Sequence, residues 1–225
     1  MRKETSARTT TLISHDHIFC ATLVAGAMLL TLGNIARAES PNPREVTIKQ
    51  IMYGGTGCPL GTVAANISPD AKAMTLFFDQ FVAQAGPASE VSDAYKVCNL
   101  SIDLRVPHGW SYTLLGVDYR GFANLDPGVI GVQRAEYWLQ GTSSRSIPLR
   151  STIVGPFADD YIYKDRLALN ALVWSPCAVT RALNIRTSVS ITGANARNRK
   201  HGLMTVDSID GELKHIYGIQ WRRCR

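Results

Sequence analysis

Apolar and polar residues alternate strictly along several stretches of the chain. From Cys98 to Val106 every second residue is apolar, and residues 185–191 repeat the pattern. Because successive side chains of a strand point to opposite faces, a period of two predicts strands with one buried face. Two more inward rows are expected, one of Met74, Leu76, Phe78 and Val82 and one of Leu213, Tyr217, Ile219 and Trp221.

Turn residues separate these runs at intervals of about ten residues. Pro107-His108-Gly109 and Asp126-Pro127-Gly128 have the composition of tight turns. They would bound strands at 98–106, 110–120 and near 129–139. Many short strands with regular turns predict an all-β single domain, an antiparallel β-sandwich of jelly-roll-like type with two disulfides.

Helical periodicity is nearly absent from the chain. The best helix candidate covers residues 164–172, which is short and keeps no capped 3.6-residue period. It does not change the prediction of an all-β class.

The N-terminus has the pattern of an export signal. Basic residues precede an uncharged stretch from Ile18 to Ile35, and Ala36-Arg37-Ala38 matches the small-x-small rule of signal peptidases. We therefore expect a signal peptide at 1–38, a flexible leader at 39–49 and a β-sandwich domain at 50–225. A membrane anchor is the alternative, but polar and small residues dilute the apolar stretch, so no membrane span is expected after cleavage. The expected location is secreted or periplasmic.

The charge of the chain is modest, with a formal net value of +6. Its basic residues are scattered except for two clusters, Arg197, Arg199 and Lys200 and then Arg222, Arg223 and Arg225. Such clusters are typical of a solvated loop and tail, so we expect no nucleic-acid partner.

Four of the five cysteines lie after the signal, which predicts disulfides in an oxidising compartment. Four cysteines allow three pairings, and we expect the neighbouring ones, Cys58 with Cys98 and Cys177 with Cys224. Each would close a loop of some 40–50 residues, worth about 4 kcal/mol by chain entropy. Cys98 is in phase with a buried strand face, so its bridge should lie against the core. A metal site is the rival, but close-spaced Cys-x-x-Cys pairs are absent.

Catalytic and cofactor motifs are missing from the sequence. It contains no Gly-x-Ser-x-Gly, no His-Glu-x-x-His and no phosphate-binding loop, and we expect no metal and no cofactor. A secreted hydrolase is the alternative function. Its acid and base residues would have to come together only in space, with Asp118, Asp159, Asp160 or His108 as candidates.

Aromatic residues crowd two neighbouring expected strands. We take five of them as candidate ligand-binding residues that would stack on sugar rings: Trp110, Tyr112, Tyr119, Tyr137 and Trp138. Counting by twos places Trp110 and Tyr112 on one face and Tyr119 on the other. The competing interpretation is that most of these rings are core or cross-strand pairs.

An ordered set of short motifs resembles a known family. The set includes Gly57-Cys58-Pro59, Leu76-Phe77-Phe78-Asp79-Gln80-Phe81, Val106-Pro107-His108-Gly109-Trp110, Asp118-Tyr119-Arg120-Gly121 and Gln220-Trp221-Arg222-Arg223-Cys224. Together these motifs resemble the secreted domain of unknown function family 4360 of fungi and bacteria, over nearly all of 50–225. The resemblance implies a secreted, cysteine-paired domain and brings no catalytic residue with it.

These observations favour a non-catalytic module with a binding or structural role at the cell envelope. Glycan binding is the specific form of this hypothesis, with a cell-envelope or extracellular polysaccharide as the partner. The hydrolase remains open as the alternative.

Overall fold

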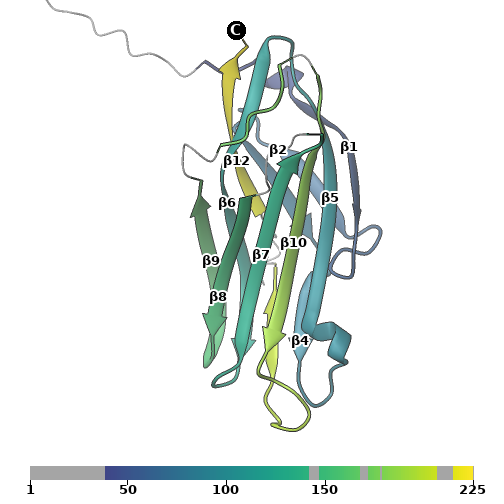
Figure 1. Ribbon diagram of the computed structural model, residues 1–225, viewed down its shortest axis with the longest axis vertical. Coiled ribbons are helices and arrows are strands. Elements are labelled where there is room, and N and C mark those ends of the chain that lie inside the picture. The colour runs from purple at the N-terminus through teal and green to yellow at the C-terminus, as the bar shows by residue number, and fades with distance from the viewer. Residues whose placement is uncertain (1–38, 142–146, 168–171, 178, 207–214, 225) are drawn as a thin grey trace, which may run out of the picture. The chain divides into compact units, whose positions relative to one another are not determined.

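Alternating stretches of the chain form strands of two antiparallel sheets (Figure 1). The computed structural model describes residues 39–141, 147–167, 172–177, 179–206 and 215–224. The expected signal peptide 1–38, residues 168–171 of the helix candidate and Leu213 lie outside the described residues.

Five strands make the sheet that faces the viewer in Figure 1, here called the front sheet. In spatial order they are β1 (Thr47–Gly54), β5 (Tyr95–Arg105), β10 (Leu183–Thr192), β7 (Ile130–Leu139) and β8 (Ile147–Val154).

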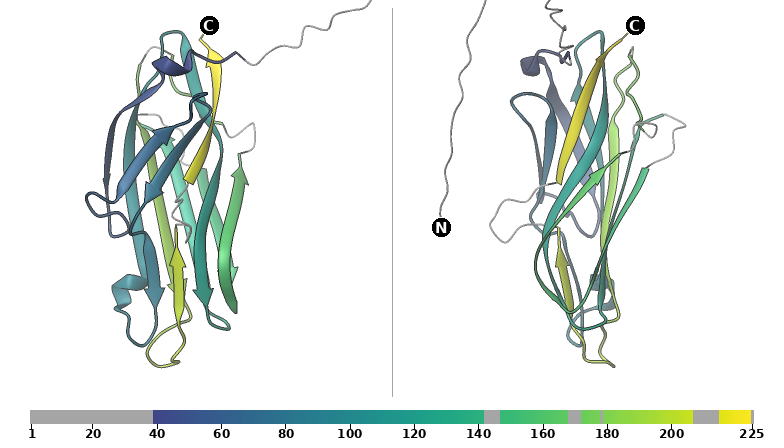
Figure 2. Two further views of the ribbon diagram at one scale, coloured as in Figure 1. Left: turned by 180° about the vertical axis from the view of Figure 1, so that it is seen from behind. Right: turned by 90° about the vertical axis from the view of Figure 1, so that its left-hand side faces the viewer.

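The remaining strands make the back sheet, seen from behind in Figure 2. Their order is β2 (Val63–Ile67), β3 (Ala73–Phe78), β12 (His215–Arg223), β6 (Trp110–Leu125), β11 (Gly202–Thr205) and β4 (Val82–Ala85), with β9 (Phe157–Arg166) paired to β6. Two short 3-10 helices, η1 (Pro43–Glu45) and η2 (Val91–Ala94), precede β1 and β5. Within the described residues, no helix reaches the length and apolarity that a membrane crossing requires.

Consecutive strands often lie in different sheets, so many connections cross from one sheet of the sandwich to the other. β5 lies in the front sheet, β6 in the back sheet and β7 in the front sheet again. The predicted turn at residues 107–109 makes the first of these crossings, and the Trp110 amide donates to the Pro107 carbonyl at 3.2 Å. Gly109 has φ of +78°, a conformation that glycine adopts without strain.

The inner faces of both sheets form one apolar core. Cys98, Leu100, Ile102 and Leu104 of β5 are all buried, as the alternation predicts. Ile185, Val189 and Ile191 of β10 lie beside them, and Tyr217, Ile219 and Trp221 of β12 are buried in the back sheet. The all-β antiparallel sandwich is therefore confirmed.

Two segments differ from the alternation inferred from the sequence. A turn follows β3, so that Phe81 is buried and Val82 is only half-buried, while Ala83 and Ala85 of β4 point inward. The expected inward row therefore ends at Phe78 and does not include Val82. Residues 164–166 of the helix candidate form the end of β9, because they pair with β6 opposite Asp118, Val117 and Gly116.

Regular secondary structure is present before residue 50. Helix η1 covers Pro43–Glu45, and β1 begins at Thr47, inside the stretch expected to be a flexible leader. Thr47 pairs with Arg105 and Ile48 with Leu104, so the first strand is fixed along the edge of the front sheet.

Candidate functional site

A β-bulge in β6 decides where the predicted aromatic residues point. Gly116 pairs with Gly218 and Leu114 with Ile219, so Leu115 is an extra residue with no partner on β12. Such a residue shifts the phase of a strand by one. Tyr119 therefore lies on the same inner face as Tyr112, and the expectation that Tyr119 would face the opposite way was wrong.

Four of the five candidate aromatics belong to the core. Trp110, Tyr112, Tyr119 and Tyr137 are each at most 7% exposed. Tyr112 packs against Trp221 with ring centroids 5.8 Å apart. The guanidinium of Arg223 covers the ring of Trp110 at 4.3 Å. Burial also raises the pKa of the Tyr112 and Tyr137 hydroxyls well above the ordinary tyrosine range.

Trp138 differs from the other four because it lies on the outer face of the front sheet. Its neighbours Tyr137 and Leu139 are buried, whereas Trp138 is half-buried and pairs with Asn184 of β10. The same outer face carries Tyr95 at the start of β5, opposite Ser190. Tyr95 is 46% exposed, which leaves its ring accessible to a ligand.

A hollow of about 410 Å³ lies on this outer face, in the middle of the sheet. We call it the front groove. It is lined by Tyr95, Arg134, Ala135, Glu136, Arg186, Ser188 and Ser190. Ser188 is buried between its neighbours, whereas Arg134 and Arg186 are exposed. The groove therefore has a serine floor and walls made of long side chains.

Strand register brings these groove residues together from three strands. Arg134 of β7 lies opposite Ser188 of β10, and Glu136 lies opposite Arg186. On the other side of β7, Arg134 lies directly opposite Arg150 of β8, which is also exposed. Three guanidinium groups thus stand beside one half-buried carboxylate.

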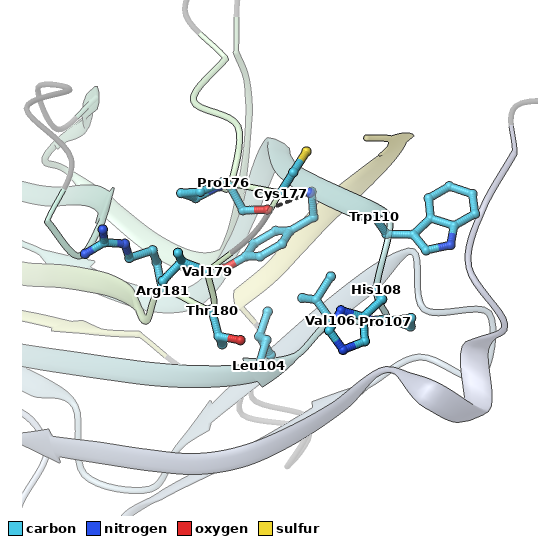
Figure 3. A pocket seen from close by; sticks show the side chains of 12 residues that line it. Leu104, Val106, Pro107, His108, Trp110, Pro176, Cys177, Val179, Thr180 and Arg181 are labelled. Atoms are coloured by element: carbon cyan, nitrogen blue, oxygen red, sulfur yellow. Dashed lines mark hydrogen bonds between the residues drawn. The ribbon is translucent and has the colours of Figure 1, made fainter. Parts of the chain in front are cut away.

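A second cavity opens at one end of the sandwich (Figure 3). His108, Trp110 and Tyr112 line it together with residues 175–177 and 179–181. Its volume is about 60 Å³, far below the several hundred that a sugar-sized ligand needs. Its lining contains no Asp or Glu among the described residues, so His108 has no carboxylate beside it in this cavity.

The three candidate carboxylates lie elsewhere, on the back sheet. Asp118 of β6 is held by Arg166, whose Nη1 donates to Oδ1 at 2.6 Å. Asp159 and Asp160 of β9 are both exposed, and Asp159 Oδ1 accepts the Asp160 amide at 2.8 Å. The structure does not bring these acids together with His108. No cluster of three His, Cys, Asp or Glu side chains suited to a metal occurs within the described ranges.

Asp165 is a carboxylate that the sequence did not single out. It faces inward from β9, and its Oδ2 atom is buried with no hydrogen-bond partner among the described residues. Burial raises the pKa of this carboxyl, Arg166 opposes the shift, and the nearby Asp118 adds to it. The sequence did not reveal the inner face of β9, because the last residues of this strand, 164–166, were interpreted as part of a helix candidate.

Both disulfides have the predicted pairing. Cys58 joins Cys98 with Cα atoms 5.4 Å apart, and both residues are fully buried. The bridge fixes the glycine-rich turn to β5, where the Gly57 amide also donates to the Val97 carbonyl at 2.9 Å. Cys177 joins Cys224 with Cα atoms 5.7 Å apart and ties the end of β12 to the segment after β9.

Sequence reasoning missed most of the front groove. Arg186, Ser188 and Ser190 were visible as the polar phase of a clean strand, but a polar phase alone indicates only a solvated face. What makes a groove is the order β5-β10-β7, which places Tyr95, Ser188 and Arg134 side by side although they are distant in the sequence.

Comparisons with other proteins locate the chain in a family. Residues 44–224 match the family described as a domain of unknown function, DUF4360. A protein of Arthroderma benhamiae described as "Uncharacterized secreted protein" is 42% identical over 186 residues, which cover 83% of this chain and 75% of that protein.

Two solved structures are distant likenesses. One is TmCBM61 in complex with β-1,4-galactotriose, with 12% identity, a TM-score of 0.27 and coverage of 84% of this chain and 100% of the other. The other is the enzymatically active domain of tailspike protein 4 of bacteriophage CBA120, with 13% identity, a TM-score of 0.22 and coverage of 81% and 20%. Neither TM-score is high enough to align one site with another.

The family match spans nearly the whole described chain, and the secreted relative agrees with two disulfides that need an oxidising compartment. The protein is therefore a secreted, disulfide-bonded β-sandwich that belongs to the DUF4360 family.

Proposed function

We propose that this protein is a non-catalytic binding module that holds an extracellular or cell-envelope polysaccharide against the outer face of the front sheet. The observation that carries the proposal is the pair of accessible aromatic residues, Tyr95 and Trp138, with the polar front groove between them.

The two rings stand far enough apart for a polymer to lie across the sheet. Tyr95 is opposite Ser190 and Trp138 is opposite Asn184, so six residues of β10 separate their positions. At 3.3 Å per strand residue this is about 20 Å, which spans several sugar units. An aromatic ring offers a flat apolar surface to the C–H face of a sugar. Two rings at this spacing can contact two separate units of one extended chain.

The groove between the rings supplies polar partners for sugar hydroxyls. Ser188 and Ser190 offer hydroxyls, Arg134 and Arg186 offer N–H donors, and Glu136 offers acceptors. All of them are mounted on paired strands, which hold their positions better than loops do.

Another open hollow of the described residues is less suited to a sugar chain. A cleft of about 420 Å³ lies between η2 and the loop after β10. Small apolar residues such as Ala85, Ala94 and Ala194 line much of it, and no aromatic ring does. Of these two hollows of the described residues, the front groove is the one that combines an aromatic ring with polar partners.

A binding experiment tests the proposal. The secreted protein, purified from culture medium, is applied to a glycan array and to insoluble cell-wall polysaccharides, beside its Tyr95→Ala variant. Loss of one stacking ring should weaken binding about two- to tenfold, as expected for 0.5–1.5 kcal/mol. Ile162→Ala is the matched control, because Ile162 is 53% exposed on β9 of the other sheet.

Two results would overturn the proposal. One is absence of binding to every glycan tested. The other is turnover on a panel of hydrolase substrates that Asp118→Asn or His108→Ala abolishes, which would favour the hydrolase.

A further inference from the structure

The front groove carries an excess of positive charge, and we infer that its ligand is an anionic polysaccharide whose carboxylate or sulfate groups bind Arg134, Arg150 and Arg186. The inference rests on the proposed function and specifies its ligand class.

Strand register places like charges next to each other at this site. Arg134 and Arg150 lie directly opposite each other on β7 and β8. Like charges directly opposite each other destabilise a sheet. Arg186 follows on β10, one strand further across the sheet. Among the described residues that line the groove, Glu136 is the acidic one beside Arg134 and Arg186, and Arg150 adds a further positive charge next to the groove.

The three arginines differ from two arginines elsewhere in the molecule that are held by carboxylates. Arg166 is paired with Asp118 at 2.6 Å, and Arg223 with Glu39 at 3.0 Å. Among the described residues, Arg134, Arg150 and Arg186 take part in no ion pair within 4 Å and donate no side-chain hydrogen bond. Their guanidinium donors are therefore available to a ligand.

Guanidinium groups match the chemistry of acidic sugars. A planar guanidinium donates two parallel hydrogen bonds to a carboxylate or a sulfate, and this bidentate pairing is stronger than a neutral hydrogen bond. Neighbouring strands are about 4.8 Å apart, so Arg150 and Arg134 stand side by side on β8 and β7, and Arg186 follows diagonally on β10, two residues from the partner of Arg134. A polymer with repeated acid groups can occupy several of them at once.

The test uses four polymers of defined chemistry. Polygalacturonate carries carboxylates, and its fully methyl-esterified form is the neutral counterpart. Dextran sulfate and dextran form the sulfate pair. The secreted protein is titrated with each polymer by isothermal calorimetry at low and high salt, beside Arg134→Gln, Arg186→Gln and the control Arg44→Gln. Arg44 is an exposed arginine of η1, outside the groove lining.

We expect binding to one acidic polymer and little binding to its neutral counterpart, with affinity that falls as salt is added. Arg134→Gln and Arg186→Gln should each weaken it about tenfold, as loss of a charged hydrogen bond predicts. Arg44→Gln should bind like the wild type. Whether polygalacturonate or dextran sulfate binds more tightly separates a carboxylate ligand from a sulfate ligand.

Other outcomes overturn the inference in distinguishable ways. Equal binding of neutral and acidic polymers, lost only in Tyr95→Ala, would refute the anionic ligand and leave the polysaccharide site standing. No binding to any of the four polymers or to the glycan array would refute both. Tighter binding to a single-stranded oligonucleotide of equal charge would replace the polysaccharide with a nucleic acid. The circular dichroism spectrum and melting temperature of each variant exclude misfolding as the cause.

Discussion

Single residues decide both the stability and the surface of this sandwich, and Asp165 shows how. Its side chain lies on the inner face of β9, and within the part of the chain that the structure describes its Oδ2 atom is buried without a hydrogen-bond partner. The charge of this carboxylate raises the pKa of Tyr137 further, in addition to the effect of burial. A buried polar atom without a partner costs about 1–3 kcal/mol, so this position opposes folding when the carboxyl is ionised.

We expect Asp165→Asn to stabilise the protein at neutral pH. The pKa of Asp165 is raised above its ordinary value of 3.8 in the folded state. The folded protein therefore holds this proton more tightly than the unfolded chain does. The contribution of Asp165 to the free energy of unfolding is full below pH 3.8 and falls as the pH rises through the folded-state pKa. The asparagine variant carries no charge at this position, so its free energy of unfolding at pH 7 should be about 1 kcal/mol higher than that of the wild type.

Urea unfolding of both proteins between pH 3 and pH 8 measures this difference. Asp160→Asn is the control, because Asp160 is exposed on the same strand. If Asp165→Asn raised the free energy of unfolding as much at pH 3 as at pH 7, the stabilisation would come from packing and not from ionisation.

Prediction from the sequence succeeded for some residues and failed for others, for a physical reason. Cys98 could be assigned to a buried face because the strand around it is regular. Tyr119 could not, because the extra residue Leu115 shifts the phase of β6, and nothing in the composition of residues 110–120 reveals a bulge. The aromatics were visible, but whether a ring is core or surface depends on that phase.

At the scale of elements, the segment after β9 completes the back sheet. β9 pairs with β6 only up to Gly116. Beyond that point the segment 172–177 continues along the same edge, and the Ser175 amide donates to the Tyr112 carbonyl at 2.8 Å. Ser111 Oγ donates to the Ser175 carbonyl at 2.6 Å, and Thr113 Oγ1 donates to the Val173 carbonyl at 2.9 Å. Side chains here take the place of a regular strand ladder.

Ser175→Ala should therefore lower the stability of the protein. The Tyr112 amide donates to Ser175 Oγ at 2.9 Å, and both residues are buried. Alanine leaves this donor without an acceptor, which costs about 1–3 kcal/mol. Thermal unfolding should show a melting temperature several degrees lower.

Thr180→Ala serves as the comparison, because Thr180 follows in the same stretch and is exposed. An unchanged melting temperature in Ser175→Ala would mean that water replaces the hydroxyl and that the segment does not stabilise β6.

Elements with a regular alternation were predictable, and those held by irregular contacts were not. β5, β6, β7 and β10 all appear where the pattern placed them. The edge segment 172–177 has no alternation because serine and threonine hydroxyls hold it, and such bonds leave no periodic signal in the sequence. The order of strands in each sheet could not be predicted from the sequence either. The groove formed by Arg134, Ser188 and Tyr95 depends on that order.

For the whole molecule, the two disulfides act on different parts of the sandwich. Cys58 and Cys98 are fully buried within the core. Cys177 is exposed, and its bridge to Cys224 joins the last residues of β12 to the segment after β9. The sequence separations are similar, 40 and 47 residues, so chain entropy alone predicts nearly equal stabilisation.

Removal of each bridge should nevertheless have unequal effects. The double variant Cys58→Ala with Cys98→Ala should lose more than the roughly 3–4 kcal/mol of chain entropy, because it also leaves a cavity in the core. The double variant Cys177→Ala with Cys224→Ala should lose about the chain-entropy amount or less. Amide exchange in this second variant should become faster locally, at position 224 and at Ser175. The amide of residue 224 donates to the Gly109 carbonyl at 2.8 Å.

Polysaccharide binding should persist in the variant without Cys177 and Cys224, since neither cysteine lines the front groove. Hydrogen-exchange mass spectrometry with denaturant unfolding measures both effects, and equal losses with uniform exchange would show that both bridges act only through the unfolded chain.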